Sequence, residues 1–476
     1  MDKIKRIINV IVPMTICNLK CHYCYLSQTE SFDKNIPKLE YDLDTIKECL
    51  TLQRLGGPCM MNLCAVGETL MAPYIVELSK NLLENGHYVT IVTNGTIEKK
   101  IKEFTKISSD LKKHLFFKFS YQYLELKRLN MLDTFFKNIK LIRDNNISFS
   151  IELTANDESI KFIKDIKEMC MKNVGFYPHI IESRNNNDGF KKLTKLKNNE
   201  HMKNWREFDS PLIEFQDKMW GEKRKEFCYA GDWIFTLYLQ NGNIAPCFGG
   251  GPIIQNIFEN PNEPIHFKAI GCKCPWSHCY AAYVLLTLGA IPELDTPLYS
   301  ELRNRIDKKG KECLQKEMKY FMSSKFIESN VEYNQDAKNI INWIREIDFN
   351  NTVMSEIKYM NSLENLLINK NIKNIGIVFD EKYVKNIINI LKPQKIKLKF
   401  CIYMIEEENI RKNSPIKSKL KYITKKIIKM EKIPVITQFD KHPKVDAIIC
   451  FDINKYISYK KDGNKENIIL VTDLWR

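Results

Sequence analysis

Short apolar runs alternate with helical patterns from residue 7 to about residue 184 of this chain. The apolar runs predict strands, and the segments between them predict helices. Strands that alternate with helices form a parallel sheet with right-handed crossovers. The pattern therefore predicts an α/β fold, a partial (β/α)6 TIM-like barrel. The expected strands are residues 7–13, 59–65, 88–93, 115–121, 147–154 and 176–182, and the expected helices are residues 42–55, 72–85, 97–113, 131–145 and 158–172.

Three closely spaced cysteines follow the first expected strand. Cys17, Cys21 and Cys24 have the spacing C-x3-C-x2-C. Three thiolates this close can bind three irons of a cubane cluster and leave the fourth iron open to another ligand. Zinc is the alternative, because a C-x2-C pair also suits that ion. Sites on β/α barrels lie at the carboxyl ends of the strands, so the position of this triplet predicts a role in catalysis.

The cysteine triplet resembles that of the radical S-adenosylmethionine (SAM) enzymes. In that family the open iron binds SAM, and one electron cleaves SAM to a 5′-deoxyadenosyl radical that abstracts hydrogen from a substrate. By this resemblance, Tyr23 occupies the position that contacts adenine. Gly67 and Glu68 stand where the family's Gly-Gly-Glu holds the methionine amino group, although Val66 replaces the first glycine.

Three further segments match the same family in order along the chain. Thr93-Asn94-Gly95-Thr96 ends the third expected strand, as it often does in these enzymes. Ser120 matches a position that contacts the ribose or methionine part of SAM, and Thr154 lies where the fifth strand approaches adenine. The resemblance therefore implies a SAM site built from Tyr23, Gly67, Glu68, Ser120 and Thr154.

Two of the expected strands have one polar and one apolar face, with the period of two that a strand requires. If helices cover the apolar faces, the polar side chains face the barrel lumen. A polar lumen suits an open barrel that holds a ligand, whereas the alternative is a pair of edge strands with one wet face. No catalytic acid or radical relay is assigned, and Lys118, Tyr121 and Glu152 are the lumen candidates. The residues expected to face the lumen by this period are Lys118, Ser120, Gln122, Glu152 and Thr154.

A second group of cysteines begins at Cys228 and resembles the auxiliary-cluster extension called SPASM or twitch. Cys228, Gly242 and Cys247 fit C-x13-G-x4-C, with a Gly242 turn that joins two strands. A zinc site with four thiolates is the alternative. The resemblance implies one auxiliary 4Fe-4S cluster, or two, and leaves the choice between Cys272 and Cys274 open. The candidate ligands are Cys228, Cys247, Cys272, Cys274 and Cys279, with Cys313 as a distant sixth cysteine.

The last part of the chain predicts a small Rossmann-like α/β domain with five strands. Val378-Phe379-Asp380-Glu381-Lys382 stands where a glycine-rich phosphate loop would be expected, so we do not expect dinucleotide binding. The expected domains are the barrel at 1–200, the cysteine-rich auxiliary domain at 201–290, a helical linker region at 291–365 and the Rossmann-like domain at 366–476.

Composition limits the classes of partner. The formal net charge is +15, but the lysines are dispersed, which is typical of a solvated surface and not of a nucleic-acid site. The 15 cysteines cluster or sit singly in apolar runs, which suits a reducing cytoplasm better than a disulfide scaffold. The longest apolar run after the first strand is too short to span a bilayer.

These features together predict a cytoplasmic radical SAM enzyme that acts on a carbohydrate or other small substrate. An electron donor such as flavodoxin or ferredoxin is the expected partner. A peptide or protein maturase is the alternative. Such enzymes often begin with a leader-binding domain, whereas only a short segment precedes the first expected strand here, so we favour this alternative less. A non-catalytic iron–sulfur or zinc protein that binds a partner is the rival from another class.

Overall fold

The computed structural model divides the chain into two compact units, which we describe separately. The first unit is Met1–Cys272 with Ser277–Asn334, and the second is Lys273–Trp276 with Gln335–Arg476. The structure describes residues 2–349, apart from residues 31, 33–35, 187–190, 250–252, 273, 275 and 277, and it also describes residues 373–378, 397–402, 435–436, 447–450 and 468–470.

A nine-stranded sheet forms the centre of the first unit. Its order is β11-β10-β9-β1-β2-β3-β4-β5-β6, and every neighbouring pair from β9 to β6 is parallel. The two outermost strands are not paired with each other, so the barrel is partial, as the alternating pattern predicts. The first six strands are β1 (Arg6–Val12), β2 (Cys59–Ala65), β3 (Tyr88–Thr93), β4 (Leu115–Ser120), β5 (Ser148–Ala155) and β6 (His179–Glu182).

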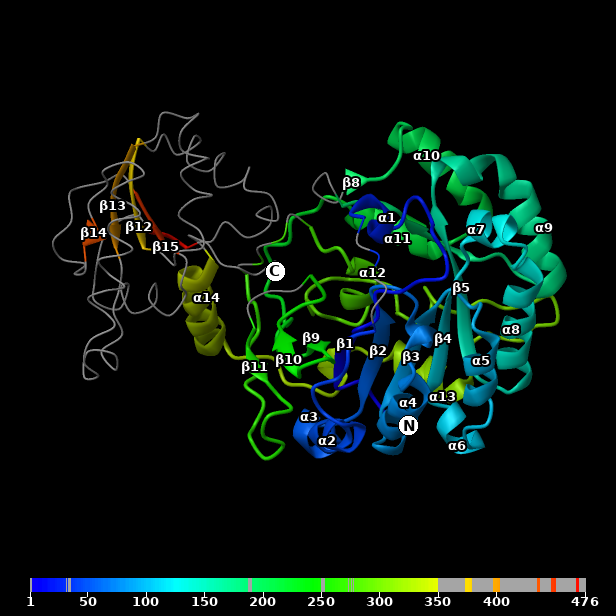
Figure 1. Ribbon diagram of the computed structural model, residues 1–476, viewed down its shortest axis with the longest axis horizontal. Helices are drawn as coiled ribbons and strands as arrows, with labels where there is room; N and C mark the ends of the chain where they lie inside the picture. Colours follow the sequence, from blue (N-terminus) through cyan, green and yellow to red (C-terminus); the bar gives the residue numbers. More distant parts are fainter. Residues whose placement is uncertain are drawn as a thin grey trace. The chain divides into compact units, whose positions relative to one another are not determined.

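Helices lie along the outer face of this sheet, and α8 and α9 mark that face in Figure 1. The expected helix at 42–55 is divided into two, because Asp42 and Thr51 each cap a new helix start with a side-chain oxygen. The short helix α1 lies at the opposite end of the sheet from α2 and α3 (Figure 1). The crossover helices are α2 (Leu43–Cys49), α3 (Leu52–Leu55), α4 (Ile75–Glu84), α5 (Glu98–Phe104), α6 (Ser109–Lys112), α7 (Tyr123–Arg128), α8 (Leu132–Asp144), η2 (Asp157–Phe162) and α9 (Ile163–Asn173), while α1 (Tyr25–Gln28) and η1 (Thr69–Met71) follow β1 and β2.

Side chains alternate in direction along each strand, so the sheet has a core face, which the helices cover, and a hollow face, which lines the barrel lumen. All aromatic and aliphatic residues of β4 and β5 except Phe116 belong to the hydrophobic core that the helices cover. Among the residues of the other parity, Phe116 is apolar and buried, whereas the rest are polar and several of them keep partial exposure. Two of these polar residues, Ser120 and Thr154, line the cavity described below. The core face carries Phe117, Phe119, Ile151 and Leu153, and the lumen face carries Lys118, Ser120, Glu152 and Thr154.

The cysteine-rich segment continues the barrel sheet. β9 (Ile234–Tyr238) pairs in parallel with β1, and β10 (Asn243–Ala245) folds back antiparallel to it. Gly242 makes the turn between them with φ +77°, a conformation that favours glycine. The remaining elements around this segment are β7 (Arg184–Asn185), β8 (Lys191–Lys192), α10 (Asn198–Trp205), η3 (Arg206–Phe208), α11 (Pro211–Met219), β11 (Gln255–Asn256) and α12 (Ala282–Leu285).

Residues 291–334 differ from the expected helical linker. Residues 291–315 consist of turns and loop, and only α13 (Lys316–Ser323) and η4 (Phe326–Glu328) are helical before residue 335. This segment belongs to the first unit because it closes the amino-terminal ends of the strands with hydrogen bonds. Phe149 N–H donates to Cys313 O over 3.1 Å, and Ile4 N–H donates to Ser324 Oγ over 3.0 Å.

The second unit contains a parallel five-stranded sheet with the order β14-β13-β12-β15-β16. This order, with the first strand in the middle and the chain moving outward on both sides, is that of a Rossmann-like fold. The segment that replaces the glycine-rich loop lies mostly outside the described residues, as do the connections between these strands. Its elements are α14 (Gln335–Phe349), β12 (Asn374–Val378), β13 (Lys397–Ile402), β14 (Val435–Ile436), β15 (Ala447–Cys450) and β16 (Ile468–Leu470).

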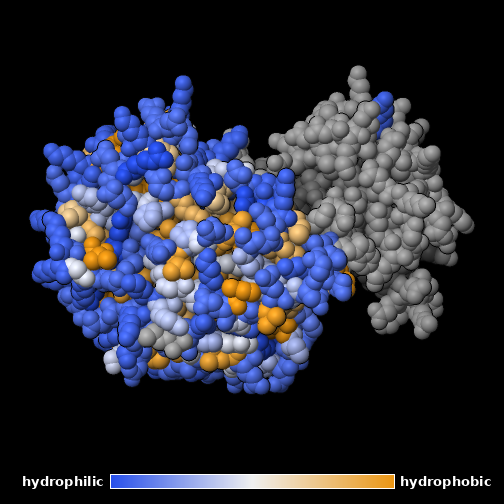
Figure 2. All heavy atoms as spheres, turned by 180° about the vertical axis from the view of Figure 1, so that it is seen from behind, coloured by the Kyte–Doolittle hydropathy of each residue, from blue (hydrophilic) through white to orange (hydrophobic). Residues whose placement is uncertain are grey.

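The surface of the first unit is mostly hydrophilic. Figure 2 shows charged and polar residues over most of its reverse face, with apolar side chains gathered toward the middle. Within the part of the chain that the structure describes, no helix has the length and apolar character that a membrane span requires.

Candidate functional site

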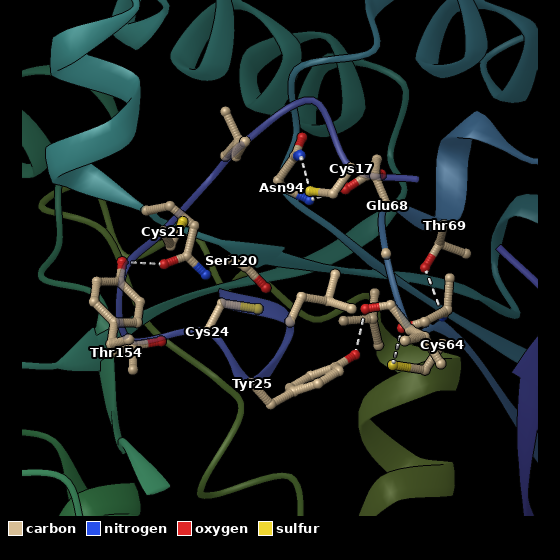
Figure 3. A pocket seen from close by; sticks show the side chains of 18 of the residues that line it. Cys17, Cys21, Cys24, Tyr25, Cys64, Glu68, Thr69, Asn94, Ser120 and Thr154 are labelled. Carbon is tan, nitrogen blue, oxygen red and sulfur yellow. Dashed lines mark hydrogen bonds between the residues drawn. The ribbon is translucent and has the colours of Figure 1, made fainter. Parts of the chain in front are cut away.

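The three cysteines of the triplet line one cavity at the carboxyl end of the barrel strands (Figure 3). The cavity holds about 260 Å³ and is partly open to solvent. Ser120 and Thr154 come from the fourth and fifth strands to the same cavity, and Glu68 comes from the loop after β2. The structure thus brings together residues that are spread over more than a hundred positions of the sequence.

The thiols of the triplet are not joined by disulfides. Burial raises the pKa of Cys17 to about 11 and also raises the pKa of Cys21 and Cys24. Among the described side chains, no three His, Cys, Asp or Glu residues are arranged so that they could hold a single metal ion. A cubane cluster requires a different arrangement, because each thiolate binds its own iron.

The end of β2 holds the cysteine loop through its backbone. Gly67 N–H donates to Met14 O over 2.6 Å, and Glu68 N–H donates to Ile16 O over 2.9 Å. A Cβ atom on Gly67 would lie 2.2 Å from the Ile16 carbonyl oxygen. Glycine at this position is therefore required for the close approach of two backbones.

The carboxylate of Glu68 is buried and receives three hydrogen bonds. Thr93 Oγ1 and Leu70 N–H donate to Oε1 over 2.6 and 3.0 Å, and Asn94 N–H donates to Oε2 over 2.8 Å. Burial raises the pKa of Glu68, while these three donors act to lower it. The donors fix the carboxylate at the wall of the cavity, where it is available to a cation such as an ammonium group.

Asn94 links the third strand to the cysteine loop. Its amide nitrogen donates to Asn18 Oδ1 over 2.8 Å and lies 3.9 Å from Cys17 Sγ. Thr96 N–H donates to Asn94 Oδ1 over 3.1 Å and so orients this amide. The segment Thr93–Thr96 is recognised in the sequence by resemblance alone, and that resemblance assigns no such role to Asn94. The polar residues at the strand end are the sequence signal that could have suggested it.

Tyr23 lines the same cavity. The residue is 6% exposed, and its hydroxyl donates to Gln122 Oε1. Gln122 also lines the cavity, together with Ser120 and Thr154. The five residues that the resemblance assigns to SAM binding therefore line one cavity, and Gln122 and Cys64 line it as well.

Two of the three lumen candidates lie in the lumen. Lys118 Nζ is 3.5 Å from Glu152 Oε2, and both side chains extend from the hollow face of the sheet. Tyr121 is different, and the prediction that it faces the lumen is wrong. Its parity directs it to the core face, where its ring stacks on Phe135 with centroids 5.0 Å apart and packs edge-on against Phe136.

A residue that the sequence did not single out joins the lumen pair. Arg303 Nη1 donates to Glu152 Oε1, and the Arg303 side chain is fully buried. It comes from the segment that was expected to be a linker. No motif surrounds it in the sequence, so only the folding of residues 291–334 onto the barrel reveals its position.

A second buried ion cluster ends β6 beside the cavity. Glu182 lies 3.1 Å from Lys192 Nζ and 3.0 Å from His201 Nε2, and Lys192 also contacts Asp217 at 2.5 Å. Because Glu182 is paired on both sides, it stabilises the strand end that forms one wall of the cavity.

The auxiliary cysteines are distributed between the two units. Cys228 exchanges backbone hydrogen bonds with Gly271, which places the following residue, Cys272, beside it in the chain fold. Cys247 follows β10, and its carbonyl accepts from Thr236 Oγ1 over 2.8 Å. Cys228, Cys247, Cys272 and Cys279 belong to the first unit, whereas Cys274 belongs to the second.

The model of the Radical SAM superfamily matches residues 11–170. These residues form a radical SAM domain. The match covers the end of β1, the whole of β2 to β5 and most of α9, and it includes the whole cysteine triplet. A radical SAM domain binds a 4Fe-4S cluster and SAM, and the cavity fits them because three thiols, a buried carboxylate and polar strand ends surround one space.

Three solved structures are among those similar to this chain. SuiB of Streptococcus suis, bound to precursor peptide SuiA, has a TM-score of 0.38 and 18% identity over 55% of this chain and 64% of that one. The enzyme anSMEcpe with bound AdoMet has a TM-score of 0.36 and 15% identity over 54% and 76%. BtrN in complex with AdoMet and 2-DOIA has a TM-score of 0.26 and 15% identity over 55% and 81%.

The chain thus spans just under two thirds of the length of SuiB. A search of the curated proteins found no match to this chain.

Proposed function

We propose that this radical SAM enzyme abstracts a hydrogen atom from a carbon of a carbohydrate or other small substrate. The observation that carries the proposal is the convergence of Cys17, Cys21 and Cys24 on the cavity that Glu68 also lines. When bound and reduced, the cluster supplies one electron that cleaves SAM to methionine and a 5′-deoxyadenosyl radical. The protein must then position the substrate carbon and exclude competing reactions.

The chain's own residues supply that positioning. Glu68 offers a buried carboxylate to the amino group of SAM, and Tyr23 and Gln122, which are hydrogen-bonded to each other, line the same cavity. Asn94 and the Gly67 backbone hold the cysteine loop against the strand ends. The lumen below the cavity contains buried charged groups, which suit a compact polar substrate better than an apolar one.

The proposal includes one auxiliary 4Fe-4S cluster that binds substrate or accepts an electron from it. We propose Cys228, Cys247, Cys272 and Cys279 as its ligands, because these four cysteines share one compact unit. A flavodoxin or ferredoxin would reduce the SAM-binding cluster in this scheme. The chain would then use the two iron–sulfur sites for different steps.

Anaerobic reconstitution with iron and sulfide tests the proposal. After reduction and addition of SAM, we expect 5′-deoxyadenosine and methionine, measured by liquid chromatography. A protein with a full complement of iron that forms neither product would contradict an enzymatic function and favour a non-catalytic metal protein. Replacement of all three triplet cysteines with alanine should abolish cleavage and leave about four irons per chain.

Substrate class is tested separately with reconstituted enzyme. Deuterium transfer into 5′-deoxyadenosine from labelled sugars would support a small substrate. Transfer only from a labelled peptide would instead support the maturase alternative.

A further inference from the structure

The lumen beneath the cavity contains two cations and one carboxylate. Lys118 and Arg303 both pair with Glu152, which is 1% exposed. Among the residues that the structure describes, Glu152 is the only carboxylate within ion-pair distance of either cation. The cluster therefore carries one positive charge in excess.

His179 does not alter this count. It is the register partner of Glu152 on β6, and its ring is completely buried. Burial, followed by the charges of Arg305 and Arg303, holds the pKa of His179 well below its usual range. A neutral imidazole adds no charge, so the excess positive charge stays without a counter-ion.

Several donors in the same place have no acceptor. Nε and Nη2 of Arg303 and the hydroxyl of Ser150 make no hydrogen bond with the described residues. Leaving a buried donor unpaired is unfavourable, and for a charged group the cost is larger. The rings of Tyr283 and Tyr299 lie 5.1 and 4.9 Å from the guanidinium carbon and help to hold its position.

The cluster adjoins the SAM cavity. Val92 and Ser120 line that cavity, and they are the register partners of Lys118 and Glu152. The Lys118 side chain retains 14% exposure in an otherwise buried cluster. An anionic group that enters the lumen from the cavity would therefore reach Lys118 first.

We propose that Lys118, Arg303 and Ser150 bind a carboxylate group of the substrate. This inference rests on the proposed function, because it names the class of substrate that the same lumen takes. One excess positive charge matches a carboxylate, whereas a phosphate dianion would leave the cluster with a net negative charge. Arginine provides two N–H groups on one edge, which suits the two oxygens of a carboxylate.

Thermal unfolding of the reconstituted protein tests this inference with simple probes. Propionate, its neutral analogue propionamide and inorganic phosphate are added separately at constant ionic strength. We expect propionate to raise the Tm with a saturable concentration dependence and propionamide to have no effect. The substitution Lys118→Met should weaken propionate binding at least tenfold.

Two further variants separate ligand binding from a structural role. Lys100→Met is the matched control, because Lys100 is similarly shielded, at 19% exposure, but lies on the outer helix α5, where it pairs with Glu103. It should retain propionate binding. Ser150→Ala removes a buried hydroxyl that has no partner, so the Tm should not fall, while propionate binding should weaken.

Each alternative result overturns the inference. If propionate gives no shift, or gives the same shift as propionamide, the cluster is a structural ion network only. If phosphate binds more tightly than propionate, a phosphate group replaces the carboxylate. If the wild-type protein cleaves SAM but does not bind propionate, this inference is wrong and the proposed function stands. If it binds propionate but does not cleave SAM, the anion site stands and the proposed function is wrong.

Discussion

Single residues decide whether the cysteine loop can reach the strand ends. Gly67 permits the backbone contact with Ile16, and Asn94 binds the loop from the third strand. Both residues lie in segments that were recognised by resemblance to the radical SAM family. Their physical roles depend on distances between atoms far apart in sequence, so these roles follow only from the structure.

Substitution of Gly67 by alanine should release the cysteine loop. The new Cβ would lie 2.2 Å from Ile16 O, so one backbone must move, and we expect a loss of about 2 kcal/mol in unfolding free energy. Iron retained after reconstitution should fall by about one cluster. Urea unfolding and iron analysis measure these effects.

Gly221→Ala is the matched control for this change. Gly221 has φ +78°, but no atom lies within 4 Å of an added Cβ. The unfolding free energy of this variant should therefore fall by only about 1 kcal/mol, because alanine is strained in this backbone conformation. Equal iron loss in both variants would show that the Ile16 contact is unimportant.

His87 should make stability depend on pH. Cys59 N–H donates to its Nδ1, and its Nε2 contacts Leu50 O at 2.8 Å, which is an arrangement for a neutral ring. Burial lowers its pKa to about 4, whereas the ring of an unfolded chain has a pKa of about 6.5. Between these values the unfolded state binds the additional proton, so unfolding free energy should fall by about 3 kcal/mol as pH drops from 6.5 to 4.

Urea titrations of wild type and His87→Gln at several pH values measure this contribution. The variant should lack the part of the pH dependence that His87 causes. His266→Gln is the control, because the His266 side chain is exposed. A variant at position 87 with the wild-type pH profile would contradict the assignment.

At the scale of elements, the strands and helices of the barrel follow their sequence patterns closely. The six expected strands all form, because each apolar run is long enough for a strand and is followed by a helix with an apolar face. The segment 291–315 differs, because its residues satisfy their backbone groups through turns and through contacts with the strand ends. Its local composition does not indicate these distant partners.

The β9–β10 hairpin gives a prediction at this scale. Gly242→Ala would place a Cβ 2.5 Å from Asn256 Oδ1 and 2.6 Å from Phe258, in a turn with φ +77°. We expect the hairpin that precedes Cys247 to be displaced, with loss of the auxiliary cluster and retention of the SAM-binding one. Iron should fall from about eight to about four per chain, while 5′-deoxyadenosine formation continues.

Loss of SAM cleavage in Gly242→Ala, with iron unchanged, would contradict this separation of the two iron sites.

At the scale of the whole molecule, the boundary between the two compact units falls within the segment of the auxiliary cysteines. Cys272 is in the first unit next to the residue that pairs with Cys228, and Cys274 is in the second unit. The choice between them was open in the sequence, where the two cysteines are two positions apart. Because Gly271, the neighbour of Cys272, pairs with Cys228, we propose Cys272 as the ligand.

Separate serine variants test this choice. Cys272→Ser should lose about four irons per chain, because its cluster loses a ligand, and Cys274→Ser should keep the wild-type content. Iron analysis with electron paramagnetic resonance of the reduced protein measures both. The opposite pattern would assign Cys274 as the ligand.

The sequence by itself determined the alternating α/β architecture and the place of the cysteine triplet, because hydrophobic period and cysteine spacing are local properties of the chain. It also placed Lys118 and Glu152 on the hollow face, since side-chain direction alternates along a strand. Only the tertiary structure decided that Gly67 contacts Ile16 and that Arg303 pairs with Glu152. These are contacts between distant segments, and their geometry depends on how the whole first unit packs.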